Sequence, residues 1–217
     1  WSNDNYGLAG PAIFVISIHP THSSTVYAGT SEGVFRSTNG GSTWSASNNG
    51  LNGRRVTAIV IDPLTPSTVY VAINAFGGGG INGVYKSTDG GNNWNFQSNG
   101  IINPNVQGLA IDPVAPTTLY TATLDGIFKT TDGGDNWART GSGGPVTPFA
   151  LAVDPHNHTT IYATDVSPFA SGIFRSTNAG ATWQQIGLSE TGGGQFVKVS
   201  PHTPGLVFAT MSIGGVL

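Results

Sequence analysis

The stretch Arg36-Ser-Thr-Asn-Gly-Gly-Ser-Thr-Trp44 decides the fold, because the chain repeats it three more times. The other copies end at Trp94, Trp137 and Trp183, so the four Trp residues are spaced by 50, 43 and 46 residues. A regular period of this length is typical of a protein built from repeated structural units. The repeat therefore has to be interpreted before any single motif.

A second marker follows each Trp after 18 or 19 residues, in the pairs Asp62-Pro63, Asp112-Pro113, Asp154-Pro155 and Ser200-Pro201. Asp and Pro are both turn-forming residues. His19-Pro20 is a fifth copy of this marker, and its Pro lies 19 residues after Trp1. We therefore interpret Trp1 as the Trp of a repeat whose preceding Ser/Thr-rich segment is missing.

Each unit is predicted to hold four short strands. In the second unit, Val56–Ile61 is apolar and β-branched, which indicates a strand buried on both faces. Residues 68–73 and 83–87 form the next two strands, and residues 94–97 form the fourth. Four strands in about 45 residues are the signature of a propeller blade. The predicted fold is an all-β protein, a β-propeller of four-stranded antiparallel blades.

The two ends of the chain fall at matching points of the repeat. Residues 206–217 align with the second and third strands of a unit, and the chain begins at Trp1, where a fourth strand would start. We predict one domain over residues 1–217, with five blades at approximately 12–47, 56–97, 106–140, 147–186, and 195–217 plus 1–6. The N- and C-terminal strands would share the closing blade, which removes free sheet edges. The alternative is a part of a six- to eight-bladed ring.

The repeated segment resembles the Asp-box, or BNR, repeat, with the order Ser/Thr-x-Asp/Asn-x-Gly-x-x-Trp. Such repeats occur in sialidases, sortilin-type receptors, family 74 xyloglucanases and photosystem II assembly factors, and the resemblance implies a propeller. In those families the boxes lie on the periphery, away from the active site. The matching residues are Ser37, Asn39, Gly41 and Trp44; Ser87, Asp89, Gly91 and Trp94; Thr130, Asp132, Gly134 and Trp137; and Ser176, Asn178, Gly180 and Trp183.

The residue types favour a structural role for these boxes. Asn and Asp side chains can accept hydrogen bonds from the following turn, and the Ser or Thr hydroxyl can bind the same turn. Gly permits a positive φ, and Trp buries a large apolar face. Two of the four boxes carry Asn, which cannot act as a general acid or base. The boxes are therefore predicted to clamp hairpins and to take no part in catalysis.

The connections at the other end of the strands differ from unit to unit, and a regular scaffold usually carries function on its variable loops. Phe76 and Phe169 are loop aromatics that could stack on a sugar or contact a partner; plugging the ring or covering a neighbouring blade is an equal alternative. The candidate ligand-binding residues are Phe76, Asn74, Asn82, Phe169, Asp165, Tyr6, Arg54 and Arg55.

Composition excludes several classes of site and partner. The net charge of −3 gives no reason to expect nucleic acid as a partner, and no apolar run is long enough for membrane insertion. Cysteine is absent, and His156-x-His158 has no evident third ligand, so no metal and no cofactor are expected. Few charged residues beside abundant Ser, Thr, Asn and Gly resemble secreted or cell-surface proteins, of bacterial type.

Three classes of function remain open. The first is a non-catalytic secreted module that binds or scaffolds a glycan or protein partner. The second is a glycoside hydrolase, or a degenerate one, of the sialidase or xyloglucanase type. The third is a structural subunit of a surface or fibre assembly, with self-assembly. No catalytic residues are assigned: a resemblance of residues 206–216 to family 74 enzymes places Ser212 where those enzymes have a catalytic Asp.

Overall fold

A computed structural model describes residues 6–8, 10–51, 55–74, 81–167, 171–187 and 193–212. All regular elements in these ranges are strands, and they include no helix long and apolar enough to cross a membrane. The chain falls into two compact units, each described by itself: residues 1–98 with 104–106, and residues 99–103 with 107–217.

The strands follow one another in groups of four. Those of the first unit are β1 (Ile13–Ile18), β2 (Val26–Thr30), β3 (Gly33–Ser37), β4 (Ser45–Ala46), β5 (Val56–Ile61), β6 (Val69–Ile73), β7 (Gly83–Ser87) and β8 (Asn95–Phe96). Then come β9 (Val106–Ile111), β10 (Leu119–Thr123), β11 (Gly126–Thr130), β12 (Ala138–Arg139), β13 (Pro148–Val153), β14 (Ile161–Asp165), β15 (Gly172–Ser176), β16 (Gln184–Gly187), β17 (Gly193–Val199) and β18 (Val207–Ser212).

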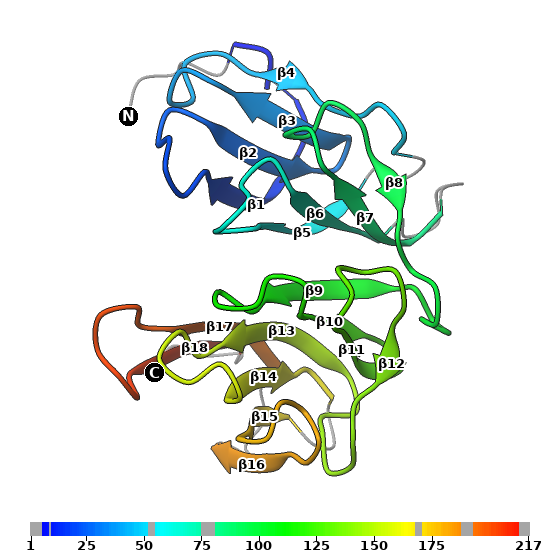
Figure 1. Cartoon of the computed structure of the whole chain (residues 1–217), viewed down its shortest axis with the longest axis vertical. Coiled ribbons are helices and arrows are strands. Elements are labelled where there is room, and N and C mark those ends of the chain that lie inside the picture. The colour runs from blue at the N-terminus through cyan, green and yellow to red at the C-terminus, as the bar shows by residue number, and fades with distance from the viewer. Residues whose placement is uncertain are drawn as a thin grey trace. The chain divides into compact units, whose positions relative to one another are not determined.

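Each group of four pairs in chain order into one antiparallel sheet (Figure 1): β1–β4, β5–β8, β9–β12 and β13–β16. β17 and β18 form a two-stranded sheet. Four antiparallel strands in simple succession are the architecture of a propeller blade, and the predicted β-propeller fold is confirmed. The fourth strand is shorter than predicted in the second blade: it starts at Asn95, because the Trp94 N–H donates to the Asn49 carbonyl at 2.9 Å and not to the third strand.

The repeated loop, defined as Ser37–Trp44 and its copies Ser87–Trp94, Thr130–Trp137 and Ser176–Trp183, has one hydrogen-bond pattern. In the first copy the Ser37 hydroxyl donates to Asn39 Oδ1 at 2.9 Å and accepts from the Gly41 N–H at 2.9 Å. Asn39 Oδ1 also accepts from the Thr43 N–H at 2.9 Å. The other three copies repeat all three bonds, with Asp or Asn as the acceptor. In each copy, the Ser or Thr hydroxyl and the Asp or Asn side chain thus accept hydrogen bonds from backbone N–H groups of their own turn.

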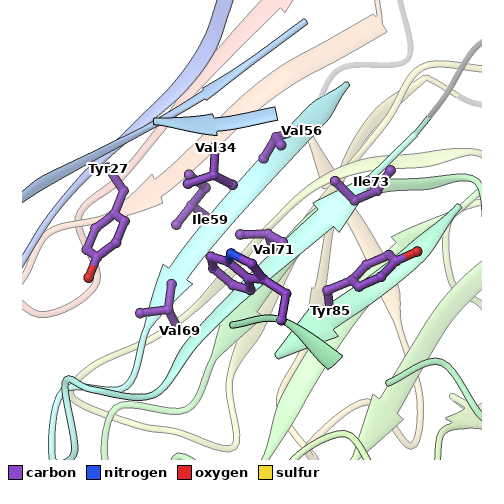
Figure 2. Packing of buried hydrophobic residues seen from close by; sticks show 9 residues of the cluster. Tyr27, Val34, Val56, Ile59, Val69, Val71, Ile73 and Tyr85 are labelled. Atoms are coloured by element: carbon purple, nitrogen blue, oxygen red, sulfur yellow. The ribbon is translucent and has the colours of Figure 1, made fainter. Parts of the chain in front are cut away.

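The core lies between consecutive blades. In the first unit, Tyr27 and Val34 from the first blade pack against β-branched side chains of the second blade (Figure 2). The buried members of this cluster are Tyr27, Val34, Val56, Ile59, Val69, Val71, Ile73, Tyr85 and Trp94. In the second unit, the third and fourth blades pack in the same way around Tyr120 and Ile161. Each blade therefore needs a neighbour to bury its faces.

A backbone bond also joins each repeated loop to the segment before it. The N–H groups of Trp44, Trp94, Trp137 and Trp183 donate to the carbonyls of Tyr6, Asn49, Asn99 and Ser142, at 2.8–3.1 Å. The last three acceptors each lie five residues after the preceding Trp, and Tyr6 lies five residues after Trp1. Tyr6 therefore occupies the position of the repeat that the interpretation of Trp1 requires.

The predicted closing blade falls partly outside the described residues, since residues 1–5 and 213–217 are not among them. Its described part is the β17–β18 sheet. Val197 is buried against Ala152 and Tyr162 of the fourth blade. On the other face of this sheet, Phe196 and Phe208 are 56% and 59% exposed.

Candidate functional site

Three predicted ligand-binding residues lie side by side at one end of the second blade. Val56 pairs with Ile73, and Ile73 pairs with Gly83, so the residues next to them are neighbours at this end. These residues are Arg55, Asn74 and Asn82. The Asn74 N–H donates to the Arg55 carbonyl at 2.9 Å, which fixes the first pair of the row. We call Arg55, Asn74 and Asn82 the blade-2 row.

Two further side chains border the blade-2 row. The Arg55 guanidinium lies over the Phe14 ring, with Cζ 4.4 Å from the ring centroid. A guanidinium over an aromatic face is an attractive cation–π arrangement. At the other side, Asn82 Nδ2 donates to Asn105 Oδ1 at 2.8 Å. Together with Phe14 and Asn105, the row therefore combines a cation, an aromatic ring and three amides, which are groups that recognise hydroxyls and other polar ligand groups.

Asn74 stands out within the row. Its side chain is fully buried, and neither Oδ1 nor Nδ2 has a hydrogen-bond partner in the described part of the chain. Leaving a buried polar group unpaired costs about 1–3 kcal/mol. Such costs are concentrated at functional sites, where a position is not optimised for stability alone.

The remaining predicted residues are distributed differently. Tyr6 is 74% exposed and contributes its carbonyl to the Trp44 N–H. Phe76, Phe169 and Arg54 lie outside the described residues.

Asp165 is the last residue of β14 and is fully buried. Its Oδ2 accepts from the N–H groups of Val146 and Thr147, at 2.6 and 3.1 Å. Its Oδ1 accepts from the Thr147 hydroxyl at 2.8 Å and from the Ser167 N–H at 2.5 Å. The carboxylate therefore fixes the connection that precedes β13 and offers no exposed surface to a ligand.

A concave region that the sequence did not predict lies beside Arg139, on β12. This groove has a volume of about 400 Å³ and is lined by Gly126, Ile127, Arg139, Thr140, Gly141, Ser142, Gly143, Gly144 and Pro145. A second groove, of about 520 Å³, shares Arg139–Gly141 and extends between the third and fourth repeated loops. The available signal was the run Gly141-Ser-Gly-Gly-Pro145 after a strand that ends in Arg. We call the first of these the Arg139 groove.

Several titratable groups elsewhere have structural partners. Hydrogen bonds, chiefly from the Asn93 side chain, lower the pKa of Asp89 to about 2. The Thr130 hydroxyl, followed by Asn136, lowers the pKa of Asp132 to about 2. His158 Nδ1 lies 3.0 Å from Asp112 Oδ2, so this histidine links two turns. No group of three His, Cys, Asp or Glu side chains within the described ranges could hold a metal ion.

Comparison with known proteins supports the fold. No protein-family model and no curated protein sequence matches the chain. Among solved structures, it is similar to an ancestral GH74 enzyme with a TM-score of 0.74 and 23% identity, over 97% of this chain and 28% of that one. The GH74 enzyme of Niastella koreensis gives a TM-score of 0.68 and 25% identity, over 88% and 32% of the two chains.

YCF48 from Cyanidioschyzon merolae is a third similar structure, with a TM-score of 0.61 and 14% identity over 93% of this chain and 71% of that one. The chain thus spans about a third or less of the GH74 enzymes that it matches. Similarity at these identities shows a shared β-propeller fold, and a fold of this kind hosts many unrelated functions.

Proposed function

We propose that the chain is a non-catalytic, secreted Asp-box propeller module that binds a glycan through the blade-2 row. The observation that carries the proposal is the alignment of Arg55, Asn74 and Asn82 at one end of one blade, beside the Phe14 ring. The half-buried Arg55 and Asn82 would contact the ligand, since a guanidinium and an amide offer donors and acceptors for sugar hydroxyls, and the Phe14 ring offers a face to the sugar's C–H groups. Asn74 is fully buried and would support the row from beneath. A protein partner with polar groups is the alternative ligand for the same surface.

The state of Asp165 supports the non-catalytic part of the proposal. A glycoside hydrolase needs two carboxyl groups on either side of the scissile bond, roughly 5–10 Å apart. Asp165 was one of the few acids predicted on the variable connections, and all its described interactions are with backbone and hydroxyl donors of its own blade. Since these bonds saturate a buried carboxylate, Asp165 is unsuited to proton transfer with a substrate.

The similarity to GH74 enzymes favours one competing function, a glycoside hydrolase. This alternative predicts release of new reducing ends from a polysaccharide such as xyloglucan. The binding proposal predicts retention of the polysaccharide without cleavage. An assay of reducing ends on incubated xyloglucan separates the two, and measurable hydrolysis by the purified chain would overturn the non-catalytic assignment.

Binding itself is tested on a glycan array with the wild type and an Arg55→Gln/Asn82→Ala double variant. We expect wild-type signals that fall at least tenfold in the double variant, while its melting temperature shows that it remains folded. Lys198→Gln is the matched control, because it also removes one positive charge but lies on β17, outside the blade-2 row. Silence of the wild type across the array would reject glycan binding and leave the scaffold function.

A further inference from the structure

Arg139 lies on the outer strand of the third blade, and the Nε–Nη2 edge of its guanidinium faces a glycine. A Cβ placed on Gly126 would come within 3.1 Å of both Nε and Nη2 of Arg139, and Gly126 has a φ of +110°. Arg139 is exposed, and none of the described residues forms a hydrogen bond or an ion pair with its guanidinium. The absence of a Cβ at Gly126 therefore leaves room for this edge of the guanidinium at the wall of the Arg139 groove.

Three other basic residues of the chain make internal contacts. Arg36 Nη1 donates to the Gly90 carbonyl at 2.7 Å, and Lys129 Nζ donates to the Ala179 carbonyl at 3.2 Å. Arg55 lies over the Phe14 ring. Arg139 differs from them, because its side chain lines a groove and its donors remain available.

The groove around Arg139 is polar and built mostly from backbone. Thr140 and Ser142 contribute hydroxyl-bearing residues, and Gly141, Gly143 and Gly144 leave peptide groups uncovered by side chains. None of its described lining residues is acidic. At about 400 Å³, it falls within the range of volumes seen for small-ligand sites.

The glycine-rich wall is held in place on three sides. The Gly141 N–H donates to the Gly180 carbonyl at 2.9 Å, and the Ser142 carbonyl accepts from the Trp183 N–H at 3.1 Å. Downstream, Asp165 accepts from the N–H groups of Val146 and Thr147. A wall fixed in this way loses little conformational entropy when a ligand binds.

We propose that the Arg139 groove binds the carboxylate of a sugar acid, as found in a uronate-containing polysaccharide. The planar guanidinium fork matches a carboxylate in a bidentate pair, which is stronger than a neutral hydrogen bond. The ring hydroxyls of the same sugar would meet Thr140, Ser142 and the exposed peptide groups. An acidic peptide fits less well, because the apolar side chains of a peptide would find only Ile127 and Pro145 as apolar partners in the lining.

The neighbouring groove explains why the carboxylate is assigned to one side of Arg139 only. Asp132 lines that second groove, and its hydrogen bonds keep the pKa near 2, so it is negatively charged at neutral pH. A second carboxylate beside it would be repelled. An anionic sugar is therefore directed to the Arg139 groove, and a neutral part of the same chain can extend past Gly141.

The test uses calorimetric titration of the purified chain with trigalacturonic acid, and with its fully methyl-esterified form as the neutral match. Wild type is expected to bind the acid at least tenfold more tightly than the ester, with an affinity that falls as salt is raised. Arg139→Gln is expected to lose this preference, with a drop of at least tenfold for the acid. Arg139→Lys is expected to keep part of it, because an ammonium retains the charge and loses the bidentate geometry.

Lys198→Gln is the matched control, because it removes one positive charge from an exposed side chain of β17 outside the lining of the Arg139 groove, and it is expected to leave trigalacturonate affinity unchanged. Trp183 provides a second readout: Gly144 packs on its indole, where an added Cβ would lie 3.2 Å from Cδ1. Binding should change the tryptophan fluorescence of the wild type, and Trp183→Phe should remove that change. Equal affinity for acid and ester, absence of binding by the wild type, or full affinity in folded Arg139→Gln would each overturn the proposal.

Discussion

The phenolic hydroxyl of Tyr120 donates to the backbone carbonyl of Ala179, 3.3 Å away in the repeated loop of the next blade. Lys129 donates to the same carbonyl at 3.2 Å. The first two blades have the same arrangement, since Tyr27 and Arg36 both donate to the Gly90 carbonyl, at 3.0 and 2.7 Å. In the second and fourth repeated loops, one backbone carbonyl therefore binds two side chains of the preceding blade, and both blades constrain the loop geometry at that residue.

This constraint leads to a prediction at Ala179. Ala179 has a φ of +55° and is the non-glycine residue with positive φ among the described residues. The other loops have Gly40, Gly90 and Gly133 there, with φ of +71°, +69° and +72°. The left-handed conformation costs an L-residue roughly 1–2 kcal/mol, part of which is offset by the lower chain entropy of unfolded Ala. Ala179→Gly should raise the free energy of unfolding by up to about 1 kcal/mol in urea denaturation.

Gly40→Ala is the matched control for Ala179→Gly. A Cβ at Gly40 meets no atom within 4 Å, so the substitution tests the backbone conformation without a clash. It should lower the free energy of unfolding by about 1 kcal/mol. Stabilisation by Gly40→Ala, or a loss of stability in Ala179→Gly, would show that φ is not what sets the residue at this position.

The Asp-containing loops should lose stability in acid, and the Asn-containing loops should not. The pKa of Asp89 and of Asp132 is lowered from 3.8 to about 2 by hydrogen bonds within each loop. A lowered carboxyl pKa stabilises the fold above about pH 4, and this contribution is lost as the pH falls towards 2. The Asp89→Asn/Asp132→Asn double variant should therefore show a smaller drop in melting temperature between pH 4 and pH 2 than the wild type.

Asp135→Asn is the comparison for the acid experiment. Asp135 lies in the same loop as Asp132, and its carboxylate makes no hydrogen bond within the described ranges. It should leave the pH dependence close to that of the wild type. If Asp135→Asn reduced the drop in melting temperature between pH 4 and pH 2 as much as the double variant does, net charge and not the loop hydrogen bonds would be the cause.

The fold could be predicted from the sequence because its signals are local and repeated. Within each copy of the repeated loop, the Ser/Thr, Asp/Asn and Gly residues form hydrogen bonds with one another over four residues or fewer. The residue types in this short segment therefore determine the geometry of the loop. The Trp spacing gives the period, and the period limits the architecture to a few classes. Even the row of Arg55, Asn74 and Asn82 follows from placing three consecutive strands in antiparallel order.

The Arg139 groove could not be predicted in the same way. It needs Gly126, at the start of β11, to meet residues 139–145, and that approach depends on how far the short strand β12 extends. The structural role of Asp165, in contrast, can be predicted by comparing equivalent positions of the repeat. Its equivalents at the ends of β2 and β10 are Thr30 and Thr123, both buried and bonded to a nearby glycine carbonyl. A strand-end position that is polar in three blades indicates a structural group.

His19 is predicted to make the first blade sensitive to mildly acidic pH. His19 lies in the turn between the first two strands of its blade. In the equivalent turns of the second and third blades, Asp62 and Asp112 each accept hydrogen bonds from two backbone N–H groups. His19 replaces them: its Nδ1 accepts from the N–H groups of Thr21 and His22, at 3.3 and 3.2 Å. Desolvation by burial, and then the nearby His22, lower the pKa of His19 from 6.5.

A histidine whose folded pKa is lowered stabilises the fold above pH 6.5, and that contribution is lost as the pH falls through the lowered pKa. Protonation of Nδ1 would also remove the acceptor of both bonds. The difference in melting temperature between pH 7.5 and pH 5 should therefore be smaller in His19→Asp than in the wild type. His202→Asn, at the turn after β17, should leave that difference unchanged; an identical profile for His19→Asp would contradict the assignment.

Asp165 is predicted to be a positioning residue, and its replacement should cost stability before it costs affinity. Asp165→Ala leaves the N–H groups of Val146, Thr147 and Ser167 without the buried carboxylate that accepts their hydrogen bonds. Loss of such a buried network costs about 3–5 kcal/mol. Urea denaturation should show this loss, and Asp125→Ala, which replaces a half-buried acid of the preceding blade, should change stability by less than about 1 kcal/mol.

Because the Val146–Thr147 segment continues the wall of the Arg139 groove, the folded fraction of Asp165→Ala should bind trigalacturonate more weakly as well. A variant with wild-type stability and abolished glycan binding would instead make Asp165 a direct ligand contact.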